Sequence, residues 1–435
     1  MALETRAWSA EALGVALGER AGGAARPATA ADTVAGVRPT VVVEPTNENE
    51  VAAILAFADA EGLKVVIRGG GTQLGLGTPP TGADILLSTR GLARLVEHEP
   101  GDMTATVEAG MTLADFQAAL GKAGQWLALD PALPADATIG GIVATAASGA
   151  QRLRYGGVRD QIIGVRIVRA DGTIAKGGGK VVKNVAGFDL PKLFTGSLGT
   201  LGAIVTATFR VYPREASAST VLLRSTDGDG LGALAVRLLA TVLVPSAIDL
   251  TGTLGEAAQT LAIRFEGSTA ACADQVRELL ALAGPLAATS ETLTSDDEAA
   301  HWQAATIPPQ AGASGGAMAL LKAMLLPGEV RGWLAALETI AARNAVGGAW
   351  RAHAGQGIVA VRLQGAESAL AATIAEARTL AVARRGSLVI EDAPPGLLAA
   401  LDPWGPSAAI ALMRRVKAQF DPHGTLNPGR FVGGI

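Results

Sequence analysis

The segment 40–72 constrains the fold of this chain more than any other part. Thr40–Val43 is a short β-branched run typical of a buried strand, and an amphipathic helix capped near Asn47 follows it. A second buried strand, Val65–Ile67, leads directly into Arg68, three glycines and a threonine. The pattern predicts a βαβ unit whose second strand ends in a glycine loop.

The glycine loop suits an anionic ligand. Without side chains, Gly69, Gly70 and Gly71 can turn successive backbone N–H groups toward a phosphate and let it approach closely. Thr72 and Gln73 can add side-chain hydrogen bonds. A flexible turn is the alternative. The loop does not match the phosphate-binding pattern GxxxxGK[ST].

A second αβ unit follows the first. Strands are expected at Met103–Ala109 and Trp126–Leu129, with a helix capped by Thr112 between them. An Asp-Gly pair predicts a hairpin between Ile162–Arg169 and Thr173–Lys176. Another long strand is expected at Gly202–Tyr212. The GxxGxxG run at 196–202 leads into this strand and not into a helix, so a Rossmann site is not expected.

A second glycine-rich segment lies at 138–149, where nearly every side chain is small. Small residues let a large flat ligand lie against the backbone, although close helix packing is the alternative explanation. Glycine segments in two separate αβ units favour a long diphosphate cofactor that spans both.

Composition excludes several classes of function. The formal net charge of −4 argues against nucleic acid as the main partner. The single cysteine, Cys272, excludes an internal disulfide framework and a cysteine-built zinc or iron–sulfur site. No stretch reaches the ~18–20 apolar residues of a membrane span, and the N-terminus lacks a signal peptide's apolar core. We therefore expect a cytoplasmic protein that reaches the inner membrane only through partners.

Four ordered motifs resemble the flavin-linked oxidase family, whose FAD domain is of the vanillyl-alcohol-oxidase or PCMH type. They are VVIRGGGTQLGLG at 65–77, TIGGIVATAASG at 138–149, RYGGVRDQIIGVRIVRADG at 154–172 and GFDLPKLFTGSLGTLGAI at 187–204. FDPHGTLNPGRF at 420–431 is similar to the family's closing segment. Within the family, the run 180–202 is most similar to the smaller flavin subunit of bacterial glycolate oxidase.

The resemblance implies an α+β protein with a PCMH-type FAD-binding domain of two α/β lobes and an α+β substrate-type domain, the FAD-linked oxidase C-terminal domain. The glycine-rich motifs stop near Pro213. Beyond it, strands are expected at Val221–Arg224, Thr260–Phe265, Ile358–Leu363 and Ser387–Ile390, with helices at 269–283, 329–343 and 366–384. We expect an N-terminal extension at 1–37, the FAD domain at 38–213, the substrate-type domain at 214–420 and a segment returning to the flavin domain at 421–435.

The resemblance also assigns residues to FAD. The first glycine loop would bind the diphosphate, and the second segment would line the ribityl chain and the ring. Backbone groups near residue 204 would face the pyrimidine edge or the adenine side. The residues are Arg68, Gly69, Gly70, Gly71, Thr72, Gln73, Thr138, Gly140, Gly141, Ser148, Gly149, Tyr155, Gly156, Ile204, Val205 and Asn427. Members with a covalent flavin commonly carry a histidine directly after the glycine run. Thr72 stands there and cannot serve, so non-covalent FAD is expected.

The catalytic residues are not identified by the motifs. Related enzymes for D-2-hydroxy acids carry a histidine cluster resembling HxGDGNxH that can hold a metal, with a later Glu-His pair. Here only the first histidine remains, as His353; Ala360 replaces the second, and the later pair is Glu391-Asp392. One histidine is not a metal site, so no metal is expected. Candidates for the chemistry are His353, Arg351 and Arg362, although a solvated strand edge is the alternative for both arginines.

Three functions stay open. The first is an FAD-binding subunit of a glycolate oxidase or dehydrogenase complex, for which the resemblance implies a larger FAD-binding subunit and an iron–sulfur subunit as partners. The second is a stand-alone oxidase of small 2-hydroxy acids, with Arg351 or Arg362 holding the carboxylate and His353 as base. The third is a structural subunit without flavin, which the intact glycine segments argue against.

Overall fold

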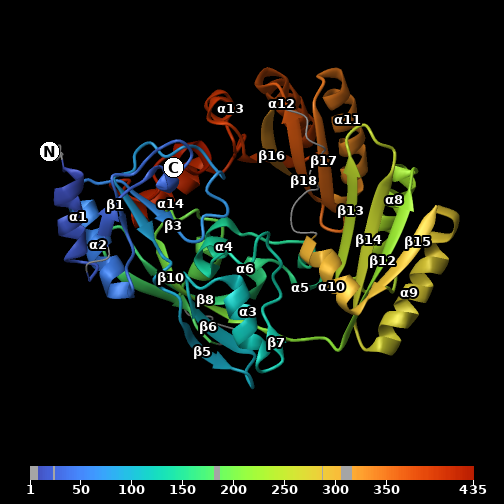
Figure 1. Cartoon of the computed structure of the whole chain (residues 1–435), viewed down its shortest axis with the longest axis horizontal. Helices are drawn as coiled ribbons and strands as arrows, with labels where there is room; N and C mark the ends of the chain where they lie inside the picture. Colours follow the sequence, from blue (N-terminus) through green and yellow to red (C-terminus); the bar gives the residue numbers. More distant parts are fainter. Residues whose placement is uncertain (1–7, 23–24, 181–186, 287, 305–315) are drawn as a thin grey trace. The chain divides into compact units, whose positions relative to one another are not determined.

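The computed structural model describes residues 8–22, 25–180, 187–286, 288–304 and 316–435. The chain divides into two compact units, drawn with their elements in Figure 1. Unit 1 consists of Met1–Ala147, Gly157–Pro213 and Pro406–Ile435, and unit 2 of Ser148–Gly156 and Arg214–Gly405. Part of the run compared with glycolate oxidase, residues 181–186, lies outside the described residues.

The boundaries differ from the expected ones in three places. The described residues of the expected extension at 1–37 are part of unit 1, because β1 (Ala25–Pro27) pairs with β2 (Val41–Val43) and α1 (Ala10–Gly18) buries Leu13 and Leu17 in the same core. Residues 148–156 leave the flavin unit for unit 2. The chain returns to unit 1 at Pro406 rather than near residue 421.

The first sheet of unit 1 has four strands in the order β1-β2-β4-β3. β2 and β3 (Val65–Arg68) both lie parallel to β4 (Ile85–Ser88), as a βαβ unit requires. The crossover helix α2 (Glu48–Ala60) begins at Asn47, whose side chain accepts hydrogen bonds from the N–H groups of Asn49 and Glu50, each 3.1 Å long.

The second sheet of unit 1 has five antiparallel strands in the order β5-β6-β10-β8-β9. Their bounds are Leu95–Glu99, Thr104–Glu108, Ala203–Arg210, Ile162–Val168 and Ile174–Gly178. Helices accompany it: α3 (Leu113–Gly121), α4 (Ile139–Thr145), α6 (Val158–Gln161), α7 (Leu190–Phe194) and, near the C-terminus, α14 (Ile410–Phe420). The hairpin expected around Asp171-Gly172 is the β8–β9 pair.

The strand expected at Trp126–Leu129 is shorter than the sequence suggested. β7 covers Gln125–Trp126 and pairs with β11 (Tyr212–Pro213). The Gln117 side chain occupies both backbone groups of Leu127, accepting from its N–H at 3.0 Å and donating to its carbonyl at 2.6 Å. The ladder therefore ends at Trp126.

Unit 2 is built on one eight-stranded antiparallel sheet in the order β15-β12-β14-β13-β17-β18-β16-β19. The bounds in that order are Thr289–Thr294, Ser217–Ser225, Gln259–Gly267, Ala247–Thr253, Gly347–His353, Ile358–Gly365, Ala317–Met324 and Ser387–Asp392. The sequence indicated β12, β14, β18 and β19, together with the helices at 269–283, 329–343 and 366–384.

Alternation along the strands gives this sheet an apolar and a polar face. The apolar face packs against α8 (Gly228–Leu238), α9 (Thr269–Ala283), α11 (Val330–Arg343) and α12 (Glu367–Ala383), which Figure 1 shows together with it. The polar face carries Thr220 and Arg264, and α10 (Ser295–Ala304) is bonded to both through Glu298. Shorter helices are α5 (Arg152–Tyr155) and α13 (Pro395–Ala400).

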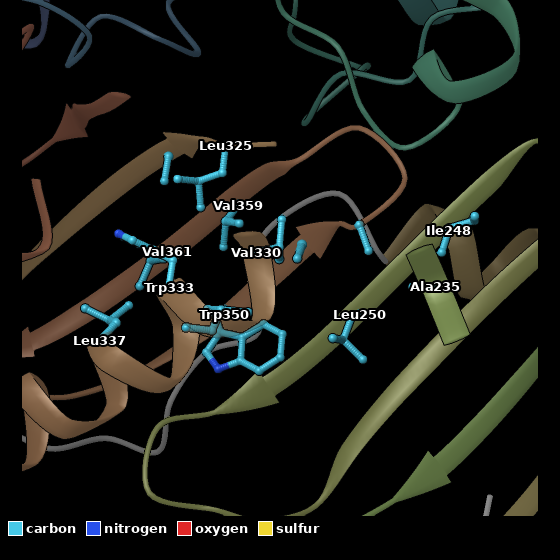
Figure 2. Close-up of a cluster of buried hydrophobic side chains, with 14 of the residues drawn as sticks. Ala235, Ile248, Leu250, Leu325, Val330, Trp333, Leu337, Trp350, Val359 and Val361 are labelled. Carbon is cyan, nitrogen blue, oxygen red and sulfur yellow. The ribbon is translucent and has the colours of Figure 1, made fainter. Parts of the chain in front are cut away.

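Trp350 on β17 lies at the centre of the apolar core of unit 2. Figure 2 shows its indole among Leu250, Val361 and Trp333, and it is fully buried. Its cross-strand neighbour is Gly252 on β13. A Cβ placed on Gly252 would lie 2.5 Å from Cζ2 of the indole, so the glycine leaves the space that the large ring fills.

We expect Gly252→Ala to destabilise the protein by about 1–3 kcal/mol, the usual cost of overpacking a well-filled core. The matched control is Gly347→Ala at the start of β17, where an added Cβ meets nothing within 4 Å. Urea unfolding of both variants checks the prediction. Equal stability of the two would show that the indole moves aside without cost.

Candidate functional site

The two predicted glycine segments touch each other in unit 1. The Gly70 N–H donates a hydrogen bond to Thr138 Oγ1 at 3.3 Å. A Cβ on Gly70 would lie 1.7 Å from the carbonyl oxygen of Asp136, and one on Gly69 would lie 2.1 Å from Thr138 Oγ1. Both positions require glycine because the second segment packs directly on the first.

The first loop offers hydrogen-bonding groups that the protein itself does not use. Within the described part of the chain, the backbone N–H groups of Gly69, Gly71, Thr72 and Gln73 meet no acceptor. Gln73 Oε1 is buried and accepts no hydrogen bond. FAD carries phosphate oxygens that need donors and hydroxyls that need acceptors, so these residues fit the cofactor.

The second segment has a different character, because the N–H groups of Ile139, Gly140 and Gly141 already donate hydrogen bonds within the protein. α4 begins at Thr138, and the N–H of Gly140 donates to the Ala109 carbonyl at 2.7 Å. A Cβ on Gly140 would lie 2.8 Å from the Ala109 Cβ. Gly140 therefore allows close packing of α4, the alternative that the sequence left open. Contacts of Gly140 and Gly141 with the flavin remain a prediction.

Ala109 also connects this helix to the residues predicted near 204. The ladder between β10 and β8 shifts register between Ile204 and Thr206. On the β6 side of β10, next to the Thr206–Glu108 pair, the Val205 carbonyl accepts from the Ala109 N–H at 2.9 Å. Ala109 thus hydrogen-bonds Val205 on one side and Gly140 on the other. The predicted backbone contacts of Ile204 and Val205 with FAD are not tested by these bonds.

Asn427 lies beside the strand that leads into the glycine loop. Its backbone N–H donates to the Val65 carbonyl at 2.8 Å, and its Oδ1 accepts from the Ile67 N–H at 2.9 Å. Its Nδ2 donates to the Leu198 carbonyl. These bonds use the side-chain amide within the protein, so Asn427 holds the β3 strand in place ahead of the loop.

Arg430 extends this attachment to the loop itself. Its guanidinium donates to the carbonyl oxygens of Leu74 and Leu76, at 2.8 and 2.6 Å. Burial lowers the pKa of Arg430 to about 10. Arg430 is not among the site residues predicted from the sequence; its position three residues after Asn427, in the motif NPGR, was the available signal.

Arg68 is engaged by a residue outside the motifs. Its Nη2 lies 3.2 Å from Asp32 Oδ1, and the same carboxylate binds Arg26 at 2.8 Å. The hydrogen bond from Arg26 is the main reason that the pKa of Asp32 falls well below its usual range. The Asp32 carboxylate therefore balances part of the positive charge of Arg68, a residue that the resemblance assigns to FAD.

Four predicted cofactor residues, Ser148, Gly149, Tyr155 and Gly156, lie in unit 2. Burial, chiefly, raises the pKa of the Tyr155 phenol, and its hydroxyl lies 3.2 Å from Glu266 Oε2. Arg154 donates to the Glu266 carbonyl at 2.9 Å. These hydrogen bonds attach the segment 148–156 to β14. A role of this segment near the flavin ring stays a prediction.

The three candidate catalytic residues share the polar face of the unit 2 sheet. His353 and Arg351 alternate on β17 with the buried Trp350 and Ala352, and Arg362 lies on the same face of β18. His353 Nδ1 lies 2.6 Å from Asp249 Oδ1 on β13. A neutral imidazole that donates from Nδ1 carries its lone pair on Nε2, so this arrangement suits a proton acceptor.

Arg351 lies against the same aspartate. Its Nε is 3.6 Å from Asp249 Oδ2, beyond a hydrogen bond, and Nε and Nη1 are buried without an acceptor. Burial lowers the pKa of Arg351, and Asp249 opposes that shift. Asp249 was not predicted as a site residue. The available signal in the sequence was a charged residue between the apolar Ile248 and Leu250.

His301 on α10 belongs to the same electrostatic neighbourhood. Burial lowers its pKa first, the positive charge of Arg351 lowers it further, and Asp249 raises it. His98 and His423 instead bond Gln125 and Asp59 in unit 1, at 2.8 and 3.0 Å. Within the described ranges, no three His, Cys, Asp or Glu side chains converge as metal ligands.

Comparisons with known proteins agree with this architecture. Residues 39–178 match the FAD binding domain model, and residues 205–431 match the model for the C-terminal domain of FAD linked oxidases. The 4-ethylphenol oxidase from Gulosibacter chungangensis has the same fold, with a TM-score of 0.74 and 15% identity over 99% of this chain and 98% of that one.

Curated relatives match over shorter spans. Glycolate oxidase subunit GlcD of Bacillus subtilis is 33% identical over 48% of this chain and 45% of its own. D-lactate dehydrogenase of Archaeoglobus fulgidus is 42% identical over 40% of this chain and 39% of its own. Glycolate oxidase subunit GlcE of Escherichia coli is 38% identical over 34% of this chain and 43% of its own. The matched part is less than half the length of each of these relatives.

We expect Gly70→Ala to weaken FAD binding by at least ~2 kcal/mol, about 30-fold, because the new Cβ collides with the Asp136 carbonyl and forces the two segments apart. Titration of the apoprotein with FAD, followed by flavin fluorescence, measures the loss. Gly101→Ala is the matched control, since a Cβ there meets nothing within 4 Å. Unchanged affinity in Gly70→Ala would exclude this loop as the phosphate site.

Proposed function

Because the chain belongs to the family of FAD-linked oxidases, we propose that it oxidises the hydroxyl group of a small 2-hydroxy acid of the glycolate or D-lactate kind. The observation that carries the proposal is the buried guanidinium of Arg351, with N–H groups that lack acceptors, beside the His353–Asp249 pair. A cation for a carboxylate and a base for a hydroxyl proton are what such a substrate needs.

Arg351, His353 and Asp249 have separate roles in the proposed reaction. Arg351 binds the substrate carboxylate, since a guanidinium presents paired N–H donors to a carboxylate. His353 Nε2 takes the hydroxyl proton, while Asp249 holds the imidazole by Nδ1 and stabilises the charge that forms. FAD, held by residues of the first glycine loop, would supply the two-electron acceptor for the hydride of C2. The substrate loses that hydride and one proton and becomes a 2-oxo acid.

We further propose that the chain works as a flavin subunit of a larger complex. Two relatives are named as glycolate oxidase subunits, which supports an assembly with a larger FAD-binding subunit and an iron–sulfur subunit. One cysteine cannot supply an ordinary four-cysteine cluster, so electrons need a partner to carry them on. No helix in the described residues is long and apolar enough to cross a membrane. Electrons would reach a membrane quinone pool through the complex.

A stand-alone oxidase is the second candidate, and the His353–Asp249 pair favours it. The pair provides a base without the metal cluster of related enzymes, so the chemistry does not require a partner. A scaffold without flavin is disfavoured by the unused N–H groups of the first glycine loop.

We expect the FAD-loaded chain alone to reduce a dye only weakly with glycolate or D-lactate, and the reconstituted complex to be active. In the complex, His353→Ala should lower kcat by roughly 10²–10⁴-fold, the usual contribution of a general base. His423→Ala, on an exposed histidine of unit 1, is the matched control. Robust turnover by the chain alone that disappears in His353→Ala would overturn the subunit proposal. An unaffected complex would place the chemistry on the partner.

We expect FAD to leave the protein on acid precipitation. Thr72, which follows the glycine run, cannot form a bond to the flavin, and Cys272 is buried in α9 outside the flavin motifs. The yellow colour should stay in the supernatant. Colour retained by the pellet would contradict a dissociable cofactor.

A further inference from the structure

We propose that β15, an edge strand of the unit 2 sheet, pairs antiparallel with β15 of a second copy of this chain and joins the two sheets into one. β15 (Thr289–Thr294) stands at one end of the strand order and has β12 as its neighbour on one side only. Figure 1 shows it beside β12 at the outer end of the sheet. The inference does not depend on the chemistry proposed for His353 and Arg351.

The outer side of β15 is a regular strand edge with free backbone groups. Its six residues pair with β12 without a bulge, from Thr294 opposite Ser219 to Thr289 opposite Arg224. All its side chains are exposed except the half-buried Leu293. Outside the ladder with β12, its backbone forms no hydrogen bond to the residues that the structure describes. Such a row of N–H and C=O groups is completed by another extended strand.

Two other edges of the larger sheets are covered by the chain itself. The Val65 N–H of β3 donates to the Thr425 carbonyl of the C-terminal segment, at 2.8 Å. The Ile390 N–H of β19, at the other end of the unit 2 sheet, donates to the Pro403 carbonyl, also at 2.8 Å. These segments occupy the places that a further strand would take.

The remaining edges of these sheets carry features that hinder pairing. β1 has three residues and contains Pro27, which has no N–H. β5 is interrupted by a register shift between Leu95 and Glu97. β9 carries Lys176 and ends at Gly178, whose φ of +72° departs from a strand. β15 contains no proline, glycine or lysine, so it has none of the usual protections of an edge.

The charge of β15 allows a second copy of itself to approach. Glu291 is its only charged residue, and Arg224 of β12 binds that carboxylate at 3.0 Å. Two such edges therefore meet without uncompensated like charges. The polar, exposed side chains also disfavour indiscriminate aggregation, which needs a hydrophobic edge.

Symmetry and side-chain pairing select one register. A two-fold axis normal to the sheet keeps the same face up in both copies, and it then passes between one residue and its own copy. Centring on Glu291 would place two carboxylates opposite each other, which is destabilising. Centring on Thr292 pairs residues 290–294 and places Glu291 opposite Leu293 of the second copy. Ser295, with φ of +54°, ends the strand directly after this overlap.

Sedimentation of the FAD-loaded full chain over a concentration series tests the pairing. We expect an equilibrium between monomer and dimer. Thr292→Lys should raise the dissociation constant of the dimer at least tenfold, because two ammonium groups would face each other across the axis. Thr339→Lys, at an exposed threonine of α11, is the matched control and should leave the constant unchanged. Urea unfolding of the two lysine variants checks that they fold equally well.

A cysteine variant tests the same contact without a change of charge. Opposite residues of an antiparallel pair have Cα atoms roughly 4.5–5.5 Å apart, within the range of a disulfide. Oxidised glutathione should therefore cross-link Thr292→Cys into a covalent dimer. In Thr294→Cys the two thiols would lie roughly 13 Å apart along the strands, so cross-linking should be at least fivefold lower. The native Cys272 is buried and does not compete.

Three results would overturn the proposal. The first is a chain that sediments as a monomer at every concentration. The second is a dimer that Thr292→Lys leaves intact, which would place the interface on another surface. The third is stronger cross-linking of Glu291→Cys or Thr294→Cys than of Thr292→Cys, which contradicts the register. A monomer whose Thr292→Lys variant no longer joins its complex would assign the edge to a partner subunit instead of a second copy.

Discussion

The contact between the Asp136 carbonyl and the Cα of Gly70 is the constraint on which the flavin unit depends. A Cβ at Gly70 would occupy almost the same place as that oxygen, so the two glycine segments can meet only as they do here. The contact joins the end of a parallel sheet to the start of α4, and Gly140 then lets α4 approach Ala109. Successive close contacts, rather than one flexible loop, fix the N–H groups that are free for a phosphate.

The C-terminal segment holds this arrangement from the other side. Asp421, fully buried, accepts from the N–H groups of Thr425 and Leu426 and pairs with Lys417, whose Nζ also donates to the Thr200 carbonyl at 2.7 Å. Burial lowers the pKa of Lys417, and Asp421 opposes that shift. A buried pair of this kind adds little net stability but disfavours other registers, because slippage would leave a charge without its partner. We infer that it sets the register in which Asn427 meets Ile67.

Local patterns explain what the sequence could predict. Three glycines after a β-branched strand, a capped helix and an Asp-Gly hairpin are adjacent in the chain, so the βαβ unit, α2 and the β8–β9 pair followed from them. Contacts between residues distant in the chain could not be predicted from such local patterns. Asp249 meets His353 because β13 pairs with β17 in one register, and Asp32 reaches Arg68 because β1 joins the first sheet. Strand order is set by packing of whole elements, which no local pattern specifies.

The polar face of the unit 2 sheet uses charge in two ways. Where α10 covers it, Arg264, Glu298 and Glu266 neutralise one another, and Thr220 supplies a further hydrogen bond to Glu298. Such a closed set tolerates burial because each polar group has its partner. On the next strands of the sheet, the single aspartate Asp249 of β13 serves both His353 and Arg351 of β17, and Arg362 of β18 has no acidic partner among the described residues. A fold gains nothing from leaving cations uncompensated beside an oriented histidine, so the imbalance is accounted for by an anionic ligand that completes the set.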